Sequence, residues 1–186
     1  MSPMRRLPLT VELALLGFLR AGPLHGYEIH RRLSDPAGLG LVWKLKQSHL
    51  YALLTRLEKE GYLTATVKPQ EARPPRKLFR LTRTGHDAFL DWVQAPVPHG
   101  RDLRLDFLTK YYFAQREGPK VLARLLKRQR AACQDWLRAQ QAQVEAARGV
   151  RPYEWQVGQF RIGQIEAMLA WLDLCEQPQA AADRGA

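Results

Sequence analysis

Hydrophobic residues in the first third of the chain fall into three helical segments. Residues 10–20 begin at Thr10, a favourable N-cap, and are apolar on nearly every side, which predicts a buried central helix. Residues 26–33 predict a short second helix. In residues 47–63 the apolar side chains recur at the i, i+3, i+4, i+7 spacing of a buried stripe, made of Leu50, Leu53, Leu54 and Leu57. We expect this third helix to end near Gly61, which suits a left-handed cap.

After Gly61 the hydrophobic period changes to the period of two that is typical of strands. Apolar and polar residues alternate in "YLTATVK" (62–68) and again in "KLFRLT" (77–82). The intervening "PQEARPPR" (69–76) is too polar and too rich in proline to belong to either strand. The pattern therefore predicts a β-hairpin with an extended basic tip.

Helical periodicity returns for the rest of the chain. One helix is expected from about Thr84 to Gln94, followed by "APVPHG" (95–100), the best linker candidate. Three further helical patterns cover about 102–115, 119–148 and 152–176, whereas the last residues have no apolar period. We expect an N-terminal domain at 1–94, a C-terminal helical domain at 101–177 and a mobile tail at 178–186.

The order of three helices and a hairpin is that of a winged helix-turn-helix. The expected fold class is mainly α with a small β-hairpin wing, joined to a C-terminal helical region. In this fold the third helix enters the DNA major groove and the hairpin tip reaches the DNA backbone or minor groove.

The polar face of the third helix suits base and phosphate contacts. It carries short donors and acceptors, an aromatic ring and cations, namely Ser48, Tyr51, Thr55, Arg56 and Lys59. Structural alternatives remain open at three positions: Ser48 as an N-cap, Tyr51 as a partly buried core aromatic, and Arg56 as a surface ion-pair partner of Glu60.

Charge supports the same interpretation. The chain has 29 Lys and Arg against 18 Asp and Glu, a net charge of +11, and residues 44–83 alone hold ten Lys or Arg and three Glu, a net +7. The basic set on the hairpin consists of Lys68, Arg73, Arg76 and Lys77. A solvated charge run is the alternative, but beside a helix-turn-helix these cations favour contacts with the phosphates of double-stranded DNA.

Other classes of protein find little support. Cys133 and Cys175 are far apart and without a CxxC spacing, so neither a disulfide framework nor a zinc site is indicated. The five histidines show no HExxH spacing, and no phosphate loop or GxSxG turn occurs. We expect no catalytic residue, no metal and no cofactor. Without an apolar run of roughly 20 residues, we expect no membrane partner and a cytoplasmic protein, nucleoid-associated when bound to DNA.

Several motifs resemble the PadR-type transcriptional regulators, named for the regulator of phenolic acid decarboxylase. They are "GPLHGYEIHRRL" (22–33), "SHLYALLTRLEKEGYL" (48–63) and "RKLFRLTRTG" (76–85), and "DLRLDFLTKYYFA" (102–114) is similar to the first C-terminal helix of longer members. The chain departs from the family pattern at Ala52, where proline is frequent, and at residues 72–75, where the wing tip is often rich in glycine.

The resemblance implies roles for particular residues. Ser48, His49, Tyr51 and Thr55 match DNA-facing positions, and Arg76 and Lys77 match the wing. Gly26 and Tyr27 match the structural start of the second helix, and Glu28 matches a contact with the scaffold. His25 matches a cap or scaffold position, with a functional proton carrier as the alternative.

The C-terminal patterns predict a dimerisation region. A helix over 119–148 would be roughly 45 Å long, and its apolar stripe would bury best against a second copy, as the family resemblance also implies. A chain ending near Gln94 is therefore expected to stay folded but monomeric.

Tryptophans suggest an aromatic effector pocket between the winged domain and the C-terminal helices, with Trp92, Trp136 and Trp155 as candidates. Ordinary core packing is the alternative for each of them.

These features predict a sequence-specific regulator, by default a repressor, that binds a palindromic operator as a homodimer and is released by a small aromatic effector. The alternative is an RNA-binding or protein-adaptor winged helix.

Overall fold

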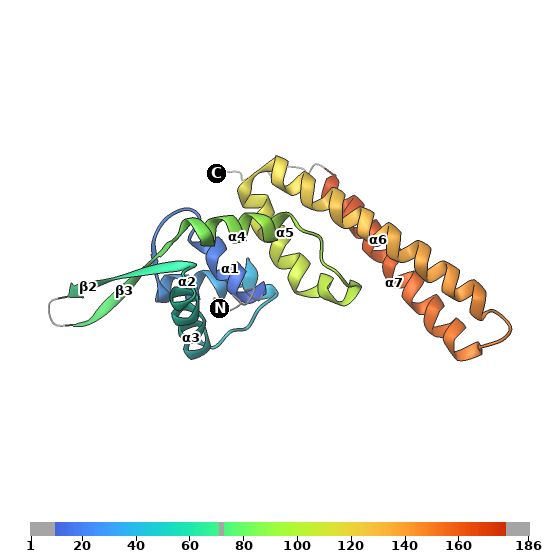
Figure 1. The fold of residues 1–186 in the computed structure, drawn as a ribbon, viewed down its shortest axis with the longest axis horizontal. Helices are drawn as coiled ribbons and strands as arrows, with labels where there is room; N and C mark the ends of the chain where they lie inside the picture. The colour runs from blue at the N-terminus through green and yellow to red at the C-terminus, as the bar shows by residue number, and fades with distance from the viewer. Residues whose placement is uncertain (1–9, 71–72, 178–186) are drawn as a thin grey trace, which may run out of the picture.

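A computed structural model describes residues 10–70 and 73–177, without the side chains of residues 68–76. In the described part, a winged helix-turn-helix lies at one end and a long helical hairpin extends from the other (Figure 1). The expected fold class is confirmed. The expected tail at 178–186 lies outside the described residues.

Three helices form the N-terminal core. They are α1 (Thr10–Phe18), α2 (Gly26–Leu33) and α3 (Gln47–Lys59), with a short 3-10 turn, η1 (Leu39–Leu41), between the last two. Every residue from Glu12 to Phe18 is buried, as expected of a segment that is apolar on nearly every side, and the charged Glu12 is buried with its apolar neighbours. The leucine stripe of α3 is buried as well, at Leu50, Leu53, Leu54 and Leu57. Burial of this stripe fixes which face of α3 remains outside.

The wing belongs to a three-stranded antiparallel sheet in the order β1-β3-β2. Its strands are β1 (Leu24–His25), β2 (Leu63–Gln70) and β3 (Arg73–Leu81). β1 was not predicted, because two residues are too few to show a period; it pairs Leu24 with Phe79.

The hairpin strands are longer than predicted, so the exclusion of residues 69–70 and 73–76 from the strands was wrong. The register shifts between Lys68 and Gln70, where Pro69 lies opposite the part of β3 that contains Pro74 and Pro75. A bulge is one of the few places in a sheet where proline fits, because the prolines have no N–H to give to the ladder. A strand that is this polar and this rich in proline cannot be predicted from composition alone.

Two helices connect the wing to the C-terminal part. α4 (Arg83–Gln94) begins where expected, and the hydroxyl of its N-cap, Thr82, accepts a hydrogen bond from the Gly85 N–H at 3.0 Å. The helix expected near 102–115 is instead a 3-10 turn, η2 (Gly100–Arg104), followed by α5 (Asp106–Glu117). Leu105 leaves the helical conformation at φ −120° and ψ −59°, so the α-helical ladder starts only at its carbonyl.

The segment between α4 and η2 is packed against its neighbours. Val97 is buried, and its N–H donates to Oε1 of Gln129 at 2.8 Å. The Lys110 ammonium donates to the carbonyl of Ala95, also at 2.8 Å. A single hydrophobic core runs from α1 through to α7. The segment is therefore held at Ala95 and at Val97. The domain boundary placed within it stays a prediction.

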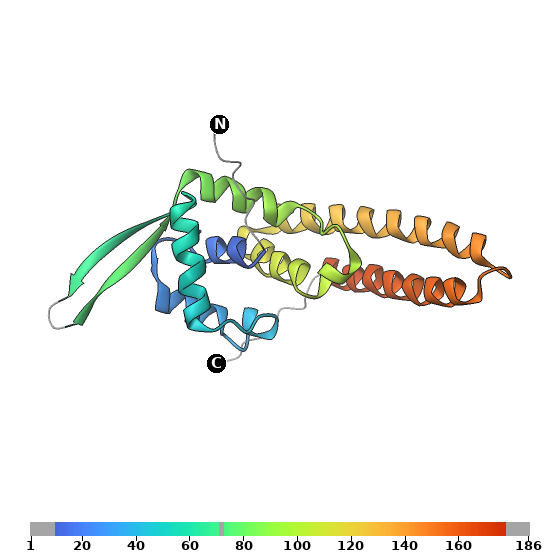
Figure 2. The same ribbon diagram turned by 60° about the horizontal axis from the view of Figure 1, so that its bottom comes forward.

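The last two helices form an antiparallel hairpin within the chain, a pairing that the sequence did not predict. They are α6 (Pro119–Ala147) and α7 (Pro152–Glu176), and they lie side by side over their length (Figure 2). Gly158 lets the backbones approach closely, because a Cβ there would lie 2.2 Å from a methyl group of Val144. Arg130 joins the two helices through Asp173 at 2.6 Å. The outer side of α7 exposes Tyr153, Phe160 and Leu174.

Within the described ranges, no helix is both long enough and apolar enough to cross a lipid bilayer.

Candidate nucleic-acid interface

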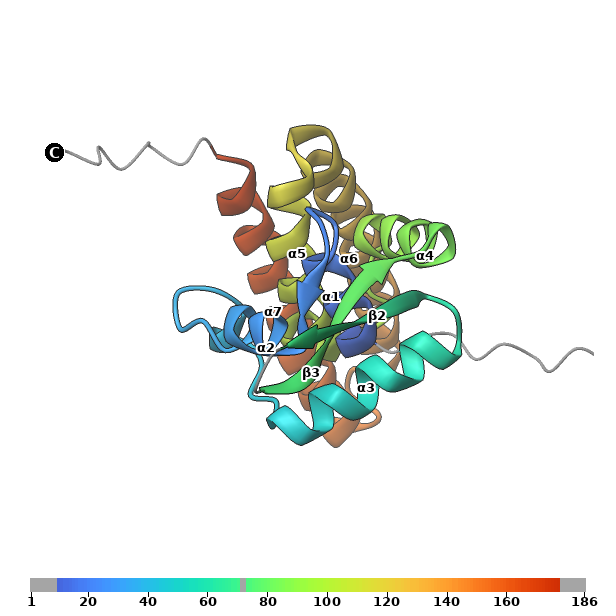
Figure 3. The same cartoon turned by 90° about the vertical axis from the view of Figure 1, so that its left-hand side faces the viewer.

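α3 and the β2–β3 hairpin lie together at the wing end of the molecule, where Figure 3 looks onto them. The polar face of α3 is open to solvent at five of the positions that the sequence singled out, which are Ser48, His49, Tyr51, Thr55 and Lys59. The buried leucines on the opposite face hold this helix at a fixed angle on α1 and α2. A helix with one anchored apolar face and one free polar face is what groove recognition needs.

Tyr51 is both exposed and supported. Its side chain keeps 40% of its surface accessible. A Cβ added to Gly26 would lie 2.5 Å from Cε1 of the Tyr51 ring, so the ring lies directly on the first residue of α2. Only glycine allows this approach. The two interpretations of Tyr51 left open by the sequence are therefore compatible, because one side of the ring packs on α2 and the rest faces solvent.

Arg56 differs from the sequence expectation. Its guanidinium pairs with the carboxylate of Glu12 in α1, a side chain that is only 1% exposed. A buried carboxylate is costly unless a cation accompanies it. Arg56 lies beside Leu57 at the edge of the polar face, so its long side chain can turn towards α1. Its charge is thus committed to the protein interior and is not one of the free cations of α3.

The wing is tied to the helices at its base. The Lys77 ammonium lies 2.9 Å from Oε2 of Glu58 in α3. The Lys77 carbonyl lies 3.0 Å from Nδ1 of His25, and the His25 N–H donates to Glu28 at 2.8 Å. These contacts agree with the scaffold roles expected for His25 and Glu28. The side chains of Lys68, Arg73 and Arg76 lie outside the described residues, so their roles stay predictions.

Three exposed residues near the interface were not among the predicted contacts. Lys44 and Lys46 directly precede α3, and their signal was visible in the basic window that begins at residue 44. Cations beside a helix N-terminus favour phosphate. Tyr27 was expected to be structural but is 61% exposed on α2. This exposure could not be predicted, because α2 is too short for its sequence pattern to show which side faces the core.

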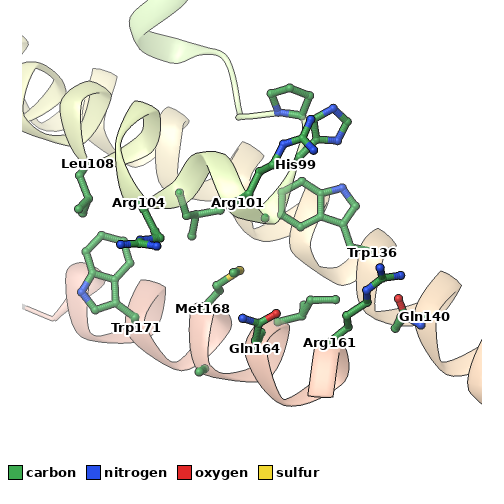
Figure 4. A pocket seen from close by; sticks show the side chains of 15 residues that line it. His99, Arg101, Arg104, Leu108, Trp136, Gln140, Arg161, Gln164, Met168 and Trp171 are labelled. Carbon is green, nitrogen blue, oxygen red and sulfur yellow. The ribbon is translucent and has the colours of Figure 1, made fainter. Parts of the chain in front are cut away.

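A second candidate site is an open cavity of about 940 Å³ between η2, α5, α6 and α7 (Figure 4). Trp136 and Trp171 contribute aromatic surface, and Arg101, Arg104 and Arg161 contribute cations. Trp171 packs edge-on against Phe107 and Tyr111, at centroid distances of 5.9 Å and 5.7 Å.

Only one of the three predicted pocket tryptophans lines this cavity. Trp136 does, whereas Trp92 packs within the core against Phe89 and Phe113. Trp155 lies in the first turn of α7, outside the cavity lining. The expectation failed for these two because tryptophan spacing says nothing about how helices from separate parts of the chain meet.

Comparisons with known proteins agree with the motifs. Residues 15–91 match the family model described as the transcriptional regulator PadR-like family. The negative transcriptional regulator PadR of Bacillus subtilis (strain 168) is 32% identical over 103 residues, which cover 55% of this chain and 56% of that protein. A probable transcriptional regulator of Mycobacterium tuberculosis is 27% identical over 84 residues, covering 45% and 43%. The chain thus spans about half the length of the curated relatives it matches.

Solved structures with some similarity include Bacillus subtilis PadR in complex with operator DNA, with 24% identity, coverage of 90% of this chain and 97% of that chain, and a TM-score of 0.47. The same protein in complex with p-coumaric acid has 24% identity, coverage of 94% and 96%, and a TM-score of 0.41. The PadR-like regulator BC1756 of Bacillus cereus has 23% identity, coverage of 94% and 97%, and a TM-score of 0.42. The family match spans the three motifs between residues 22 and 85 and confirms the resemblance found in the sequence.

Proposed function

We propose that this chain, a PadR-type winged helix-turn-helix protein, is a transcriptional repressor that binds a palindromic operator as a homodimer. The observation that carries the proposal is the arrangement of α3, whose leucine stripe is buried while its polar face is exposed beside a basic wing. In this arrangement Tyr51 and Thr55 read base edges, and Lys44, Lys46 and Lys59 contact phosphates. Repression follows from occupation of the operator, in keeping with the negative regulator among the relatives.

A homodimer is required because one recognition helix reads only a few base pairs. Specific binding normally needs two half-sites about one helical turn apart, roughly 34 Å. The exposed aromatic and aliphatic side chains of α7 supply apolar surface for a second copy, among them Tyr153, Phe160 and Leu174. The α6–α7 hairpin points away from the wing, so a dimer formed there leaves both α3 helices free (Figure 1).

Binding-site selection from random duplexes, followed by gel-shift titration, tests the proposal. Thr55→Ala should weaken the selected duplex by about 1–3 kcal/mol and leave non-specific duplexes unaffected. Lys59→Ala should weaken every duplex and lower the salt slope by about 1. Lys127→Ala removes the same charge from the exposed surface of α6 and is the matched control.

The RNA-binding or adaptor alternative predicts a different outcome. If no duplex is enriched, or if single-stranded RNA competes as well as the selected duplex, operator recognition is not the function. Equal affinities of Thr55→Ala, Lys59→Ala and the control for the selected duplex would show that α3 is not the reading helix.

We further propose that the cavity binds a small aromatic acid as an effector. Its two tryptophans offer stacking surface, and its three arginines favour a carboxylate or phenolate over a neutral or cationic group. Titration of tryptophan fluorescence with aromatic carboxylates and with the corresponding amines should give saturable binding of the acids only. Arg104→Gln should weaken this binding. Absence of saturation by any acid would contradict the proposal.

A further inference from the structure

We propose that Thr109 is a positioning residue for operator recognition: through Trp43, it sets the orientation of the recognition helix relative to the C-terminal helices. The inference rests on the proposed function. It concerns neither a DNA contact nor a cavity contact, but a hydrogen bond between the segment that leads into α3 and the first turn of α5.

The hydroxyl of Thr109 is completely buried and makes two hydrogen bonds. It donates to the Leu105 carbonyl at 2.6 Å. A hydroxyl has only one hydrogen, so its remaining lone pairs can accept, and the indole N–H of Trp43 donates to it at 2.7 Å. The donor and acceptor roles are therefore fully assigned. Removing the hydroxyl would leave the Trp43 N–H without this partner.

Trp43 is four residues before the start of α3. The backbone N–H of Trp43 also donates to the Leu39 carbonyl at 2.8 Å. In the same segment, Nε2 of His30 lies 3.2 Å from the Leu45 carbonyl oxygen. So few residues separate Trp43 from Gln47 that a displacement of the indole must move the first turn of α3. This turn carries Ser48 and His49, two of the predicted DNA contacts.

The same turn of α5 is linked to α3 by a second route. The hydroxyl of Thr10, the first residue of α1, donates to Oδ2 of Asp106 at 2.7 Å. Two residues later in α1, buried Glu12 pairs with Arg56 in α3. The start of α3 is thus connected to α5 through Trp43, and its middle through α1.

The opposite side of this α5 turn faces the C-terminal helices. The Phe107 ring packs against Trp171 of α7. Arg104 and Leu108, on either side of Leu105, line the cavity. Residues 105–109 therefore contact Trp43 and Thr10, which connect to α3, and also the helices proposed to form the dimer. In a dimer, the orientation of α3 on this turn determines the distance between the two recognition helices.

Half-site spacing gives a readout that a general loss of stability would not change. The full-length protein is titrated with its selected operator and with versions whose centre is one base pair longer or shorter. Wild type should discriminate clearly between spacings. Thr109→Val, which keeps the shape but loses the hydroxyl, should reduce this discrimination roughly threefold to tenfold, the equivalent of one buried hydrogen bond. Non-specific binding should be unchanged.

Two variants complete the set. Thr109→Ser keeps the hydroxyl and should retain wild-type spacing preference. Trp43→Phe keeps a ring but loses the N–H and should behave like Thr109→Val. Wild-type discrimination in Thr109→Val, or its loss in Thr109→Ser, would overturn the inference. A Thr109→Val protein that fails to fold would also count against it, because a positioning contact leaves the core intact.

Hydrogen exchange separates this inference from the proposed function. In the free protein, the amides of residues 44–50 should exchange faster in Thr109→Val than in Thr109→Ser. If wild type selects no operator, the proposed function fails, and the exchange measurement still decides the structural link. Equal exchange in both variants would show that Thr109 does not hold the start of α3.

Discussion

Gly26 illustrates how a single residue connects the fold to the interface. It opens α2 directly beneath the ring of Tyr51, and no larger residue leaves room for that ring. A supported ring loses less conformational freedom on binding than a free one, so in the proposed interface Gly26 would contribute to recognition through Tyr51. The Leu24-His25-Gly26-Tyr27-Glu28 run is thus explained by two structural contacts, the glycine under Tyr51 and the bond from the His25 N–H to Glu28.

We predict that Gly26→Ala separates stability from DNA binding. The new methyl group meets only the far end of a side chain, so the Tyr51 ring can rotate away and the free energy of unfolding should change by no more than about 1 kcal/mol. Operator affinity should fall because Tyr51 is displaced. Gly163→Ala on α7, where a Cβ meets nothing within 4 Å, is the control. Denaturant unfolding and gel shift test both parts; unchanged operator affinity in Gly26→Ala would contradict the role of Tyr51.

Lys110 provides a pH-dependent prediction. It is 5% exposed, and burial lowers its pKa from 10.5 to about 8, although Asp106 and Asp102 act in the opposite direction. Between pH 8 and 10.5 the unfolded chain therefore binds more protons than the folded one at this site, so the contribution of Lys110 to the free energy of unfolding rises with pH. Below pH 8 both states are protonated and the cost of burying the charge is present in full.

The measurement compares wild type with Lys110→Met by urea unfolding. From pH 7 to 9.5, wild type should gain roughly 2 kcal/mol relative to the variant. For Lys127→Met, on the exposed surface of α6, the difference in free energy of unfolding from wild type should not change over this pH range. A constant difference between wild type and Lys110→Met over this range would show that the ammonium is not destabilised by burial.

At the scale of elements, α5 joins the two parts of the molecule. The sequence grouped it with the C-terminal region, yet Phe113 packs against Phe18 and Phe89 at centroid distances of 5.3 Å and 5.6 Å. Arg20 also makes a bidentate ion pair with Glu117 of α5, with hydrogen bonds of 2.9 Å and 2.6 Å. α5 therefore completes the core of the winged helix, and any chain that lacks it exposes large aromatic side chains.

At the scale of the whole molecule, the wing and the α6–α7 hairpin lie at opposite ends of an elongated shape (Figure 2). This separation suits a protein that binds DNA at one end and a second copy near the other. The properties of a truncated chain therefore depend on whether it keeps α5, because α5 lies between the proposed DNA-binding end and the helices proposed to form the dimer.

We predict that a chain ending at Gly118 is folded and monomeric, whereas a chain ending at Gln94 is not stably folded. This differs from the expectation based on sequence. Loss of α5 exposes the aromatic surface of α1 and α4 and removes buried Phe107 and Phe113, each worth about 1.5–3 kcal/mol, a sum comparable to the stability of a small domain.

Circular dichroism and sedimentation test this comparison. The longer fragment should also retain weak, salt-sensitive binding to any duplex and lose most specific affinity, while the full-length protein sediments as a dimer. A full-length monomer, or a shorter fragment that melts cooperatively, would contradict the architecture.

The order of the elements, the leucine stripe of α3 and the concentration of positive charge near the wing could all be predicted from the sequence. These features are local: a period of 3.6 or 2, a cap or a charge run can be recognised within one segment. For this reason the bounds of α2 and α7 were predicted to the residue, and the PadR-type motifs were recognisable.

Which side chains meet across the chain depends on tertiary packing and could not be predicted from local patterns. Arg56 turns to Glu12, Trp43 reaches Thr109, and Val97 is fixed by Gln129, over separations that no periodicity encodes. Burial of a charge or hydroxyl makes such partners obligatory, because an unpaired polar group in the core is costly. The identity of each partner depends on how the helices pack, and so do the cavity and the place of α5 in both halves of the molecule.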